Sequence, residues 1–218
     1  MKRIIVLASG SGTNLQAIID ADKRKAFAGN VVGVISNIPN AKCLNRADDH
    51  GIKGIAIDHT QFASREEFEA ELAIAVDSFS PDLIILAGFM RILTPVFVDK
   101  YLGKLINIHP SLLPKYPGLN THQRAIDADD DYAGATVHYV TAELDGGPPI
   151  IQGKTPIEAG MTAPMLAERI LFNVEHLIFP VAVSWFCDNR LRYDNGRALL
   201  DDKVIDNSGI LWESKEIT

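Results

Sequence analysis

The sequence predicts an α/β fold, with a doubly wound, mostly parallel central sheet and helices on both of its faces. Apolar segments rich in β-branched residues alternate with segments of helical periodicity. The apolar segments lack the polar alternation of strands that face water. The composition of the 218 residues, 47% hydrophobic and 22% charged, is that of a globular protein. No linker rich in Gly and Ser divides the chain, so we expect a single domain over residues 1–218.

The N-terminal half, residues 1–100, is expected to be a phosphate-binding unit of alternating strands and helices. Its strands are predicted over residues 3–8, 31–36, 54–57 and 83–86, and its helices over 14–24, 41–50 and 64–79. The third helix has the clearest start, because Ser64 followed by Glu67 is a capping box in which each side chain binds a backbone N–H near the other. Helices between consecutive strands predict that these strands run parallel.

The C-terminal half, residues 101–218, is expected to be catalytic and to end in a long helix and a hairpin. A strand over 105–108 leads into a proline-rich loop over 109–118. Further strands are predicted at 135–140 and 149–155, a helix at 163–186, and hairpin strands at 191–193 and 198–200. The sequence Asp194-Asn195-Gly196 is the turn signal of that hairpin.

Charge and cysteine content argue against several classes of protein. The net charge is −7 and the pI is about 5.3, whereas a general nucleic-acid binder carries a basic excess. Two cysteines, Cys43 and Cys187, are too few for a disulfide framework or a zinc site. No apolar run is expected to approach the roughly 18–20 residues of a membrane span. The N-terminus indicates a strand followed by a loop rather than an export signal, so a cytoplasmic protein is expected.

The first candidate site is the loop Ser9-Gly10-Ser11-Gly12-Thr13-Asn14, between the first strand and the first helix. Its glycines allow a tight turn, and the free N–H groups of a helix N-terminus suit a phosphate. A dinucleotide site is disfavoured, because Leu15 stands where the third glycine of GxGxxG is needed. A P-loop is absent. The loop therefore predicts a small phosphorylated ligand, with a plain tight turn as the alternative.

The second candidate site is Asn107-Ile108-His109, at the end of a predicted strand, where open α/β sheets bind ligands. Asn107 and His109 are two residues apart and point to the same side. An amide donor and an imidazole there would serve as an oxyanion donor and a proton shuttle. Asp145 would raise the pKa of His109 and fix its tautomer if the fold brought them together. A structural histidine and a simple turn residue are the alternatives.

Two other chemistries are disfavoured. Ser111, His109 and Asp145 are the residue types of a hydrolase triad, but a GxSxG elbow is absent and only a proline separates Ser111 from His109. The remaining histidines show no ligand spacing, so no catalytic metal is expected. The acidic cluster over residues 127–131 is expected to be a solvated loop.

With these residues in view, the chain resembles the folate-dependent formyltransferases over nearly its whole length. The resemblance rests on Gly10-Ser11-Gly12-Thr13-Asn14, Leu86-Ala87-Gly88-Phe89-Met90-Arg91-Ile92-Leu93, Asn107-Ile108-His109-Pro110-Ser111-Leu112-Leu113-Pro114, Tyr116-Pro117-Gly118, Asp145-Gly146-Gly147 and Glu175-His176. Residues 169–174 fit only with a shift of one residue. The resemblance implies a Rossmann-like formyltransferase fold. It also implies transfer of a formyl group from 10-formyltetrahydrofolate to the amine of glycinamide ribonucleotide in purine synthesis.

The resemblance also implies a role for each site residue. Asn107, His109 and Asp145 would be catalytic, with direct attack by the amine and a tetrahedral intermediate that Asn107 and protonated His109 stabilise. The ribonucleotide phosphate would lie on Gly12, Thr13 and Asn14, and its ribose on Glu175. The folate-binding residues would be Arg65, Met90, Arg91, Ile92, Leu93, Thr141, Ala142, Glu143 and Leu144. Arg65 and Glu175 as plain surface residues, and 86–93 as core alone, are the alternatives.

Three competing functions remain. A 10-formyltetrahydrofolate hydrolase shares the Asn, His and Asp set but carries an N-terminal regulatory domain, which is not expected here. A methionyl-tRNA formyltransferase carries an added C-terminal domain for tRNA, which the acidic charge also disfavours. A non-catalytic module that binds a phosphorylated ligand or folate is the third. The expected partners are small molecules, with no nucleic acid and no membrane, and the expected assembly is a monomer or a homodimer.

Overall fold

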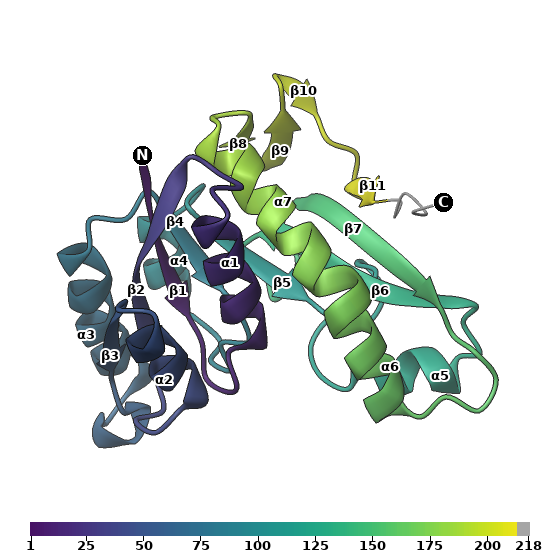
Figure 1. Ribbon diagram of the computed structural model, residues 1–218, viewed down its shortest axis with the longest axis horizontal. Helices are drawn as coiled ribbons and strands as arrows, with labels where there is room; N and C mark the ends of the chain where they lie inside the picture. The colour runs from purple at the N-terminus through teal and green to yellow at the C-terminus, as the bar shows by residue number, and fades with distance from the viewer. Residues whose placement is uncertain (213–218) are drawn as a thin grey trace.

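The centre of the molecule is an eight-stranded sheet with strand order β11-β7-β6-β5-β4-β1-β2-β3 (Figure 1). The structure is a computed structural model that describes residues 1–212; residues 213–218, the end of the predicted C-terminal half, lie outside it. The strands are β1 (Lys2–Leu7), β2 (Gly29–Ser36), β3 (Lys53–Ala56), β4 (Leu83–Leu86), β5 (Leu105–His109), β6 (Tyr132–Tyr139), β7 (Pro149–Pro156) and β11 (Ile210–Trp212). The β5–β6 and β6–β7 pairs are antiparallel, and the other five pairs are parallel. The mostly parallel sheet is confirmed.

Helices cover both faces of this sheet. One face carries α1 (Thr13–Lys23), α2 (Lys42–Asp49) and α7 (His176–Cys187); the other carries α3 (Arg65–Ser78) and α4 (Pro95–Lys100). Two separate buried clusters result, one on each face. Side chains Ile4 to Leu7 of the central β1 are fully buried, as expected of a strand covered on both sides.

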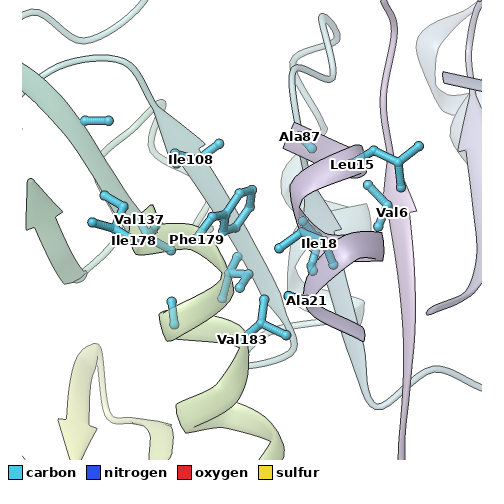
Figure 2. Close-up of a cluster of buried hydrophobic side chains, with 14 of the residues drawn as sticks. Val6, Leu15, Ile18, Ala21, Ala87, Ile108, Val137, Ile178, Phe179 and Val183 are labelled. Atoms are coloured by element: carbon cyan, nitrogen blue, oxygen red, sulfur yellow. The ribbon is translucent and has the colours of Figure 1, made fainter. Parts of the chain in front are cut away.

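The two long helices of the first face pack against each other. Figure 2 shows Ile18 and Ala21 of α1 facing Phe179 and Val183 of α7, with strand residues such as Ile108 beneath them. This packing joins the two halves of the chain, because α1 belongs to the first half and α7 to the second.

The capping box at Ser64 is present. Ser64 Oγ accepts a hydrogen bond from the Glu67 N–H at 3.1 Å, and the Glu67 carboxylate accepts from the N–H of Ala63 at 3.1 Å, one residue before the expected partner. The predicted helix over 64–79 is therefore α3 with its two caps, Ser64 and Phe79.

The predicted helix over 163–186 is continuous but not uniform. It consists of α6 (Ala163–Ile170), a π-helical turn (Leu171–Glu175) and α7. Hydrogen bonds in a π turn span five residues instead of four, so this turn holds one more residue than an α-helical turn. The extra residue falls in the segment where the sequence resemblance needed a shift of one residue.

We expected no apolar run as long as a membrane span. By the length and composition of one helix, this expectation is wrong. The 25-residue helix Ala163–Cys187 is long and apolar enough to cross a bilayer. Of its most apolar window, 44% is buried inside the protein, and Figure 2 shows Ile178, Phe179 and Val183 within the buried cluster. The core helix of a soluble protein passes the same test.

Several short elements were not predicted. They are α4, α5 (Thr121–Asp127), the 3₁₀ turn His59–Gln61, β10 (Lys203–Val204) and β11. The predicted hairpin is β8 (Leu191–Asp194) and β9 (Arg197–Leu200), and β10 extends it to a second, three-stranded sheet. The strand predicted to begin at 135 begins three residues earlier, at Tyr132.

Candidate active site

Asn107 and His109 lie on one face of β5, as the strand period predicted. Ile106 and Ile108 pack in the cluster beneath α1 and α7, whereas Leu105 packs in the cluster beneath α3 and α4. Asn107 and His109 therefore face the α3 side. On the neighbouring antiparallel strand β6, His138 is the register partner of Asn107, and Thr136 is the register partner of His109.

The fold brings Asp145 to His109. Asp145 Oδ2 lies 3.4 Å from His109 Nδ1, and the two side chains are only 9% and 7% exposed. The same oxygen accepts a hydrogen bond from the N–H of Gly118 at 2.8 Å, which ties the proline-rich loop to the site. Asp145 has a φ of +51°, and a Cβ on Gly147 would lie 1.8 Å from the carbonyl oxygen of Tyr139. This turn therefore requires a close approach that only glycine allows.

His138 also lies in this cluster, a position that its spacing from the other histidines did not predict. Its Nδ1–H donates to the carbonyl of Tyr139 at 2.8 Å, so Nε2 is free to accept from the Asn107 amide at 3.1 Å. Asp145 Oδ1 is 3.8 Å from the same Nε2. Burial is the main cause that lowers the pKa of His138 to about 4, which keeps this ring neutral. The alternation of β6 is the signal that could have identified it.

Both nitrogens of His109 are accounted for. Nε2 donates to the backbone carbonyl of Tyr116 at 2.9 Å, and Nδ1 faces Asp145. The hydroxyl of Ser111 donates to the carbonyl of Lys115 at 2.6 Å. Because that hydroxyl is directed away from the imidazole, the geometry disfavours the Ser-His-Asp alternative, as the sequence had indicated.

The loop before α1 leaves its helix N-terminus uncapped. Gly12 is the N-cap, with a φ of +70°, and no side chain caps the helix there. A Cβ on Gly12 would lie 2.8 Å from Cys43 Cβ, so α2 packs directly against this turn. The N–H groups of the first turn, from Thr13 and Asn14 onward, are therefore available to an anion.

Arg46 of α2 supplies a cation beside this loop and was also missed. Its Nε donates to the carbonyl of Ser11 at 2.7 Å, and its Nη1 donates to Gln16 Oε1 at 3.1 Å. This gives a local positive charge at the loop of a protein whose net charge is −7. Only the packing of α2 on the loop reveals this role, because Arg46 is distant from the loop in sequence.

The side chain of Glu175 contacts that of Asn14. Asn14 Nδ2 donates to Glu175 Oε2 at 2.5 Å, so the predicted ribose and phosphate residues are brought together. Glu175 is 7% exposed, so the alternative of an exposed helix residue is wrong. Burial raises the pKa of this carboxyl group. Asn14 Oδ1 is buried without a hydrogen-bond partner among residues 1–212, which leaves an acceptor for a ligand.

The predicted folate segments lie at the edge of the site. Met90 and Ile92 are 68% and 57% exposed, whereas Leu93 is buried in the same cluster against which Val140 packs. The Met90 N–H donates to Ser9 Oγ at 2.7 Å, so this segment is tied to the loop over residues 9–14. The alternative of core alone does not fit two side chains that are this exposed.

The other predicted folate residues are less closely placed. Thr141, Ala142, Glu143 and Leu144 run directly into Asp145, and Leu144 is 54% exposed. Arg65 is exposed in the first turn of α3. One turn further on, Glu69 accepts from the N–H of Thr94 at 2.8 Å, which joins α3 to the end of the first folate segment.

Among residues 1–212, no group of three or more His, Cys, Asp or Glu side chains is arranged to hold a metal ion. In the acidic loop, Asp130 accepts from Lys115 Nζ at 2.6 Å and from the Tyr116 hydroxyl at 2.8 Å. This carboxylate stabilises the proline-rich loop.

The chain is similar to known proteins over most of its length. A family model described as formyl transferase matches residues 2–183. The phosphoribosylglycinamide formyltransferase of Escherichia coli (strain K12) is 48% identical over 94% of this chain and 97% of that protein. A solved phosphoribosylglycinamide formyltransferase from Coxiella burnetii is 47% identical, with a TM-score of 0.92 over 97% of this chain and 99% of that one. The trifunctional purine biosynthetic protein adenosine-3 of Drosophila melanogaster is 44% identical over 93% of this chain and 15% of its own length. This chain therefore belongs to the formyl transferase family.

Proposed function

We propose that this formyltransferase takes its formyl group from 10-formyltetrahydrofolate and delivers it to the amine of glycinamide ribonucleotide. Its family implies a folate-type donor and small-molecule substrates, and its named relatives act in purine biosynthesis. The observation that carries the proposal is the buried pair His109 and Asp145, 3.4 Å apart, on the strand face that also bears Asn107. Together these residues offer an amide donor, an imidazole and a carboxylate, groups that can stabilise an oxyanion and move a proton.

In the proposed reaction the neutral amine attacks the formyl carbon, and the carbonyl oxygen becomes an oxyanion. His109, as imidazolium, would donate to this oxygen from Nδ1, because Nε2–H is held by Tyr116. Asp145 Oδ2, 3.4 Å from Nδ1, is beyond the usual length of a hydrogen bond and leaves that hydrogen for the oxyanion. Asn107 donates its second amide hydrogen, because the first is held by His138. One such donor contributes about 10²–10³ in rate. Asp145 stabilises the positive charge on His109.

Collapse of the intermediate completes the transfer. The bond between carbon and the folate nitrogen breaks, the carbonyl reforms, and the proton of the attacking amine passes to the departing nitrogen. Asp145, next to both histidines, is placed to carry this proton, directly or through one water. General acid–base help of this kind adds about 10²–10⁴. No step uses a metal.

The remaining residues bind the two substrates. The uncapped turn Gly12-Thr13-Asn14 and Arg46 would hold the ribonucleotide phosphate. Glu175 and the unpartnered Asn14 Oδ1 offer two acceptors to ribose hydroxyls. The folate would contact Met90, Arg91, Ile92, Leu93 and the strand-end segment 141–144, with Arg65 near its glutamate.

Three further expectations are part of this proposal. The continuous sheet and the packing of α1 on α7 support one catalytic unit made of both halves of the chain. A cytoplasmic location and a monomeric or homodimeric assembly stay predictions. Nucleic acid and membrane partners are not expected.

A single assay tests the function. Purified protein is given 10-formyltetrahydrofolate with and without glycinamide ribonucleotide, and the loss of the formyl donor is followed. Loss that depends on the ribonucleotide supports the transferase. Loss without it would indicate a hydrolase, and ligand binding without turnover would indicate a binding module. Either of these two results overturns the proposal.

A further inference from the structure

Two buried polar side chains, one on β6 and one on β7, have no part in the reaction described above. In the strand register, His109 of β5 is opposite Thr136 of β6, and Thr136 is opposite Gln152 of β7. Thr136 is fully buried and Gln152 is 7% exposed. Polar groups at such positions cost stability unless they are hydrogen-bonded, so their partners indicate what they do.

Their partners are the backbone of the loop that follows His109. Thr136 Oγ1 donates to the carbonyl of Ser111 at 2.6 Å and accepts from the N–H of Leu113 at 3.1 Å. Gln152 Nε2 donates to the carbonyl of Leu113 at 2.7 Å and to Thr136 Oγ1 at 3.0 Å. The hydroxyl thus uses its one hydrogen and both lone pairs. We call Thr136 and Gln152 the loop-anchoring pair.

The anchored loop ends on the imidazole of His109. The N–H of Ser111 donates to the His109 carbonyl at 2.9 Å, and Ser111 Oγ donates to the carbonyl of Lys115 at 2.6 Å. The next residue, Tyr116, accepts the Nε2 hydrogen of His109 at 2.9 Å. The hydrogen bond at one imidazole nitrogen decides which nitrogen is left for other work. The position of Tyr116 therefore assigns Nδ1 to the side of Asp145 and substrate.

We infer that Thr136 and Gln152 are positioning residues for His109. By fixing the backbone of residues 111–113, they hold the Tyr116 carbonyl on Nε2 and direct Nδ1 toward Asp145 and the formyl oxygen. The effect of this positioning on catalysis rests on the proposed function. Without these two side chains the backbone of residues 111–113 is no longer fixed, and the Tyr116 carbonyl is no longer held on Nε2. The imidazole of His109 then rotates away from its productive orientation but stays in the site.

The test uses isosteric pairs in the full chain. Thr136→Val removes the hydroxyl and keeps the shape, whereas Thr136→Ser keeps the hydroxyl. Gln152→Glu keeps the shape and removes the N–H donors. Thr155→Val places the same valine at a different buried threonine, on the neighbouring strand β7, and is the matched control for packing.

We expect Thr136→Val and Gln152→Glu to lower kcat by about 10–100-fold, by analogy with the loss found when the partners that orient metal-ligating histidines are removed. The KM values for both substrates should change less than about threefold. Thr136→Ser should recover most of kcat, and Thr155→Val should keep it. In a His109→Ala background, Thr136→Val should have little further effect, because its effect passes through His109.

Two results would overturn the inference: Thr136→Val with the kcat of wild type, or the same loss of kcat with His109 present and absent. The ¹⁵N spectrum of the His109 ring gives a second readout that needs no turnover. Its Nε2 signal should move in Thr136→Val and return in Thr136→Ser. An unmoved signal contradicts the inference, whereas absence of formyl transfer in the wild type contradicts only the proposed function.

Discussion

Asp145 Oδ2 lies 3.4 Å from His109 Nδ1, in a site where both side chains are nearly buried. The contact joins the end of β5 to the turn after β6. It is the relationship on which the proposed chemistry depends most directly.

Asp145→Asn keeps the shape of the side chain and removes its charge. We expect kcat to fall by about 10²–10³, because the asparagine neither stabilises the positive charge on His109 nor carries the proton of the attacking amine. The measurement is steady-state formyl transfer with both substrates varied. Asp131→Asn, at an exposed acid of the acidic loop, is the matched control and should keep wild-type kcat. Turnover of Asp145→Asn within a few-fold of wild type would contradict the assignment.

The depressed pKa of His138 predicts an acid sensitivity of the fold. Because burial holds this pKa near 4 in the folded protein, against about 6.5 in the unfolded chain, the unfolded chain binds more protons between these two pH values. Stability should therefore fall as the pH drops through this window, by up to about 1.4 kcal/mol per pH unit from this group.

The comparison of wild type with His138→Gln isolates this contribution. Denaturant unfolding from pH 7 to pH 4 should give a shallower decline of the unfolding free energy in His138→Gln, since glutamine does not titrate. Parallel declines in the two proteins would show that His138 is not the group responsible.

We predict that Glu175 lowers the stability of the ligand-free protein and strengthens binding of the ribonucleotide. Burial raises the pKa of its carboxyl group in the folded protein, so the folded state favours the protonated form and loses stability as the pH rises above about 4.5. At neutral pH, Glu175→Gln should raise the Tm of the ligand-free protein. The same change should raise the KM for the ribonucleotide about tenfold, because a charged acceptor for its hydroxyls is lost. A lower Tm together with an unchanged KM would refute both parts.

Arg46 is predicted to bind the ribonucleotide phosphate. Arg46→Ala should raise the KM for the ribonucleotide by about 10–100-fold, as expected when a charge-assisted hydrogen bond is removed, and leave the KM for the folate near its wild-type value. Inorganic phosphate should compete with the ribonucleotide more weakly in the variant. Lys42→Ala, at an exposed cation on the same helix, controls for net charge. Equal effects of the two substitutions would indicate a general electrostatic contribution instead.

The elements with the strongest local signals could be predicted from the sequence. The buried strands of the first half and the α3 cap at Ser64 are such cases, because each depends on residues within one short segment. The common face of Asn107 and His109 followed from the strand period alone. Short α4 and the two-residue β10 lack enough residues for a periodic signal.

The parts of the site that depend on tertiary contacts could not be predicted in this way. Arg46 reaches the loop over residues 9–14 only because α2 packs on Gly12. His138 reaches Asn107 only through the antiparallel register of β6. The sequence alone does not predict that Asp145 lies close to His109, because only the fold can bring them together. Their contact depends on a backbone turn that lets Gly147 approach Tyr139. The proximity of Glu175 to Asn14 came from the family resemblance and not from spacing.

The antiparallel pairing of β6 with β5 makes enzymatic activity a reporter of correct strand alignment. A slip of one residue between these strands would turn His138 and Thr136 to the opposite side and bring Val137 and Tyr139 to the reacting centre. A misaligned chain would keep most of its secondary structure and lose its turnover. Recovery of activity during refolding should therefore follow alignment of these two strands more faithfully than recovery of the circular dichroism signal does.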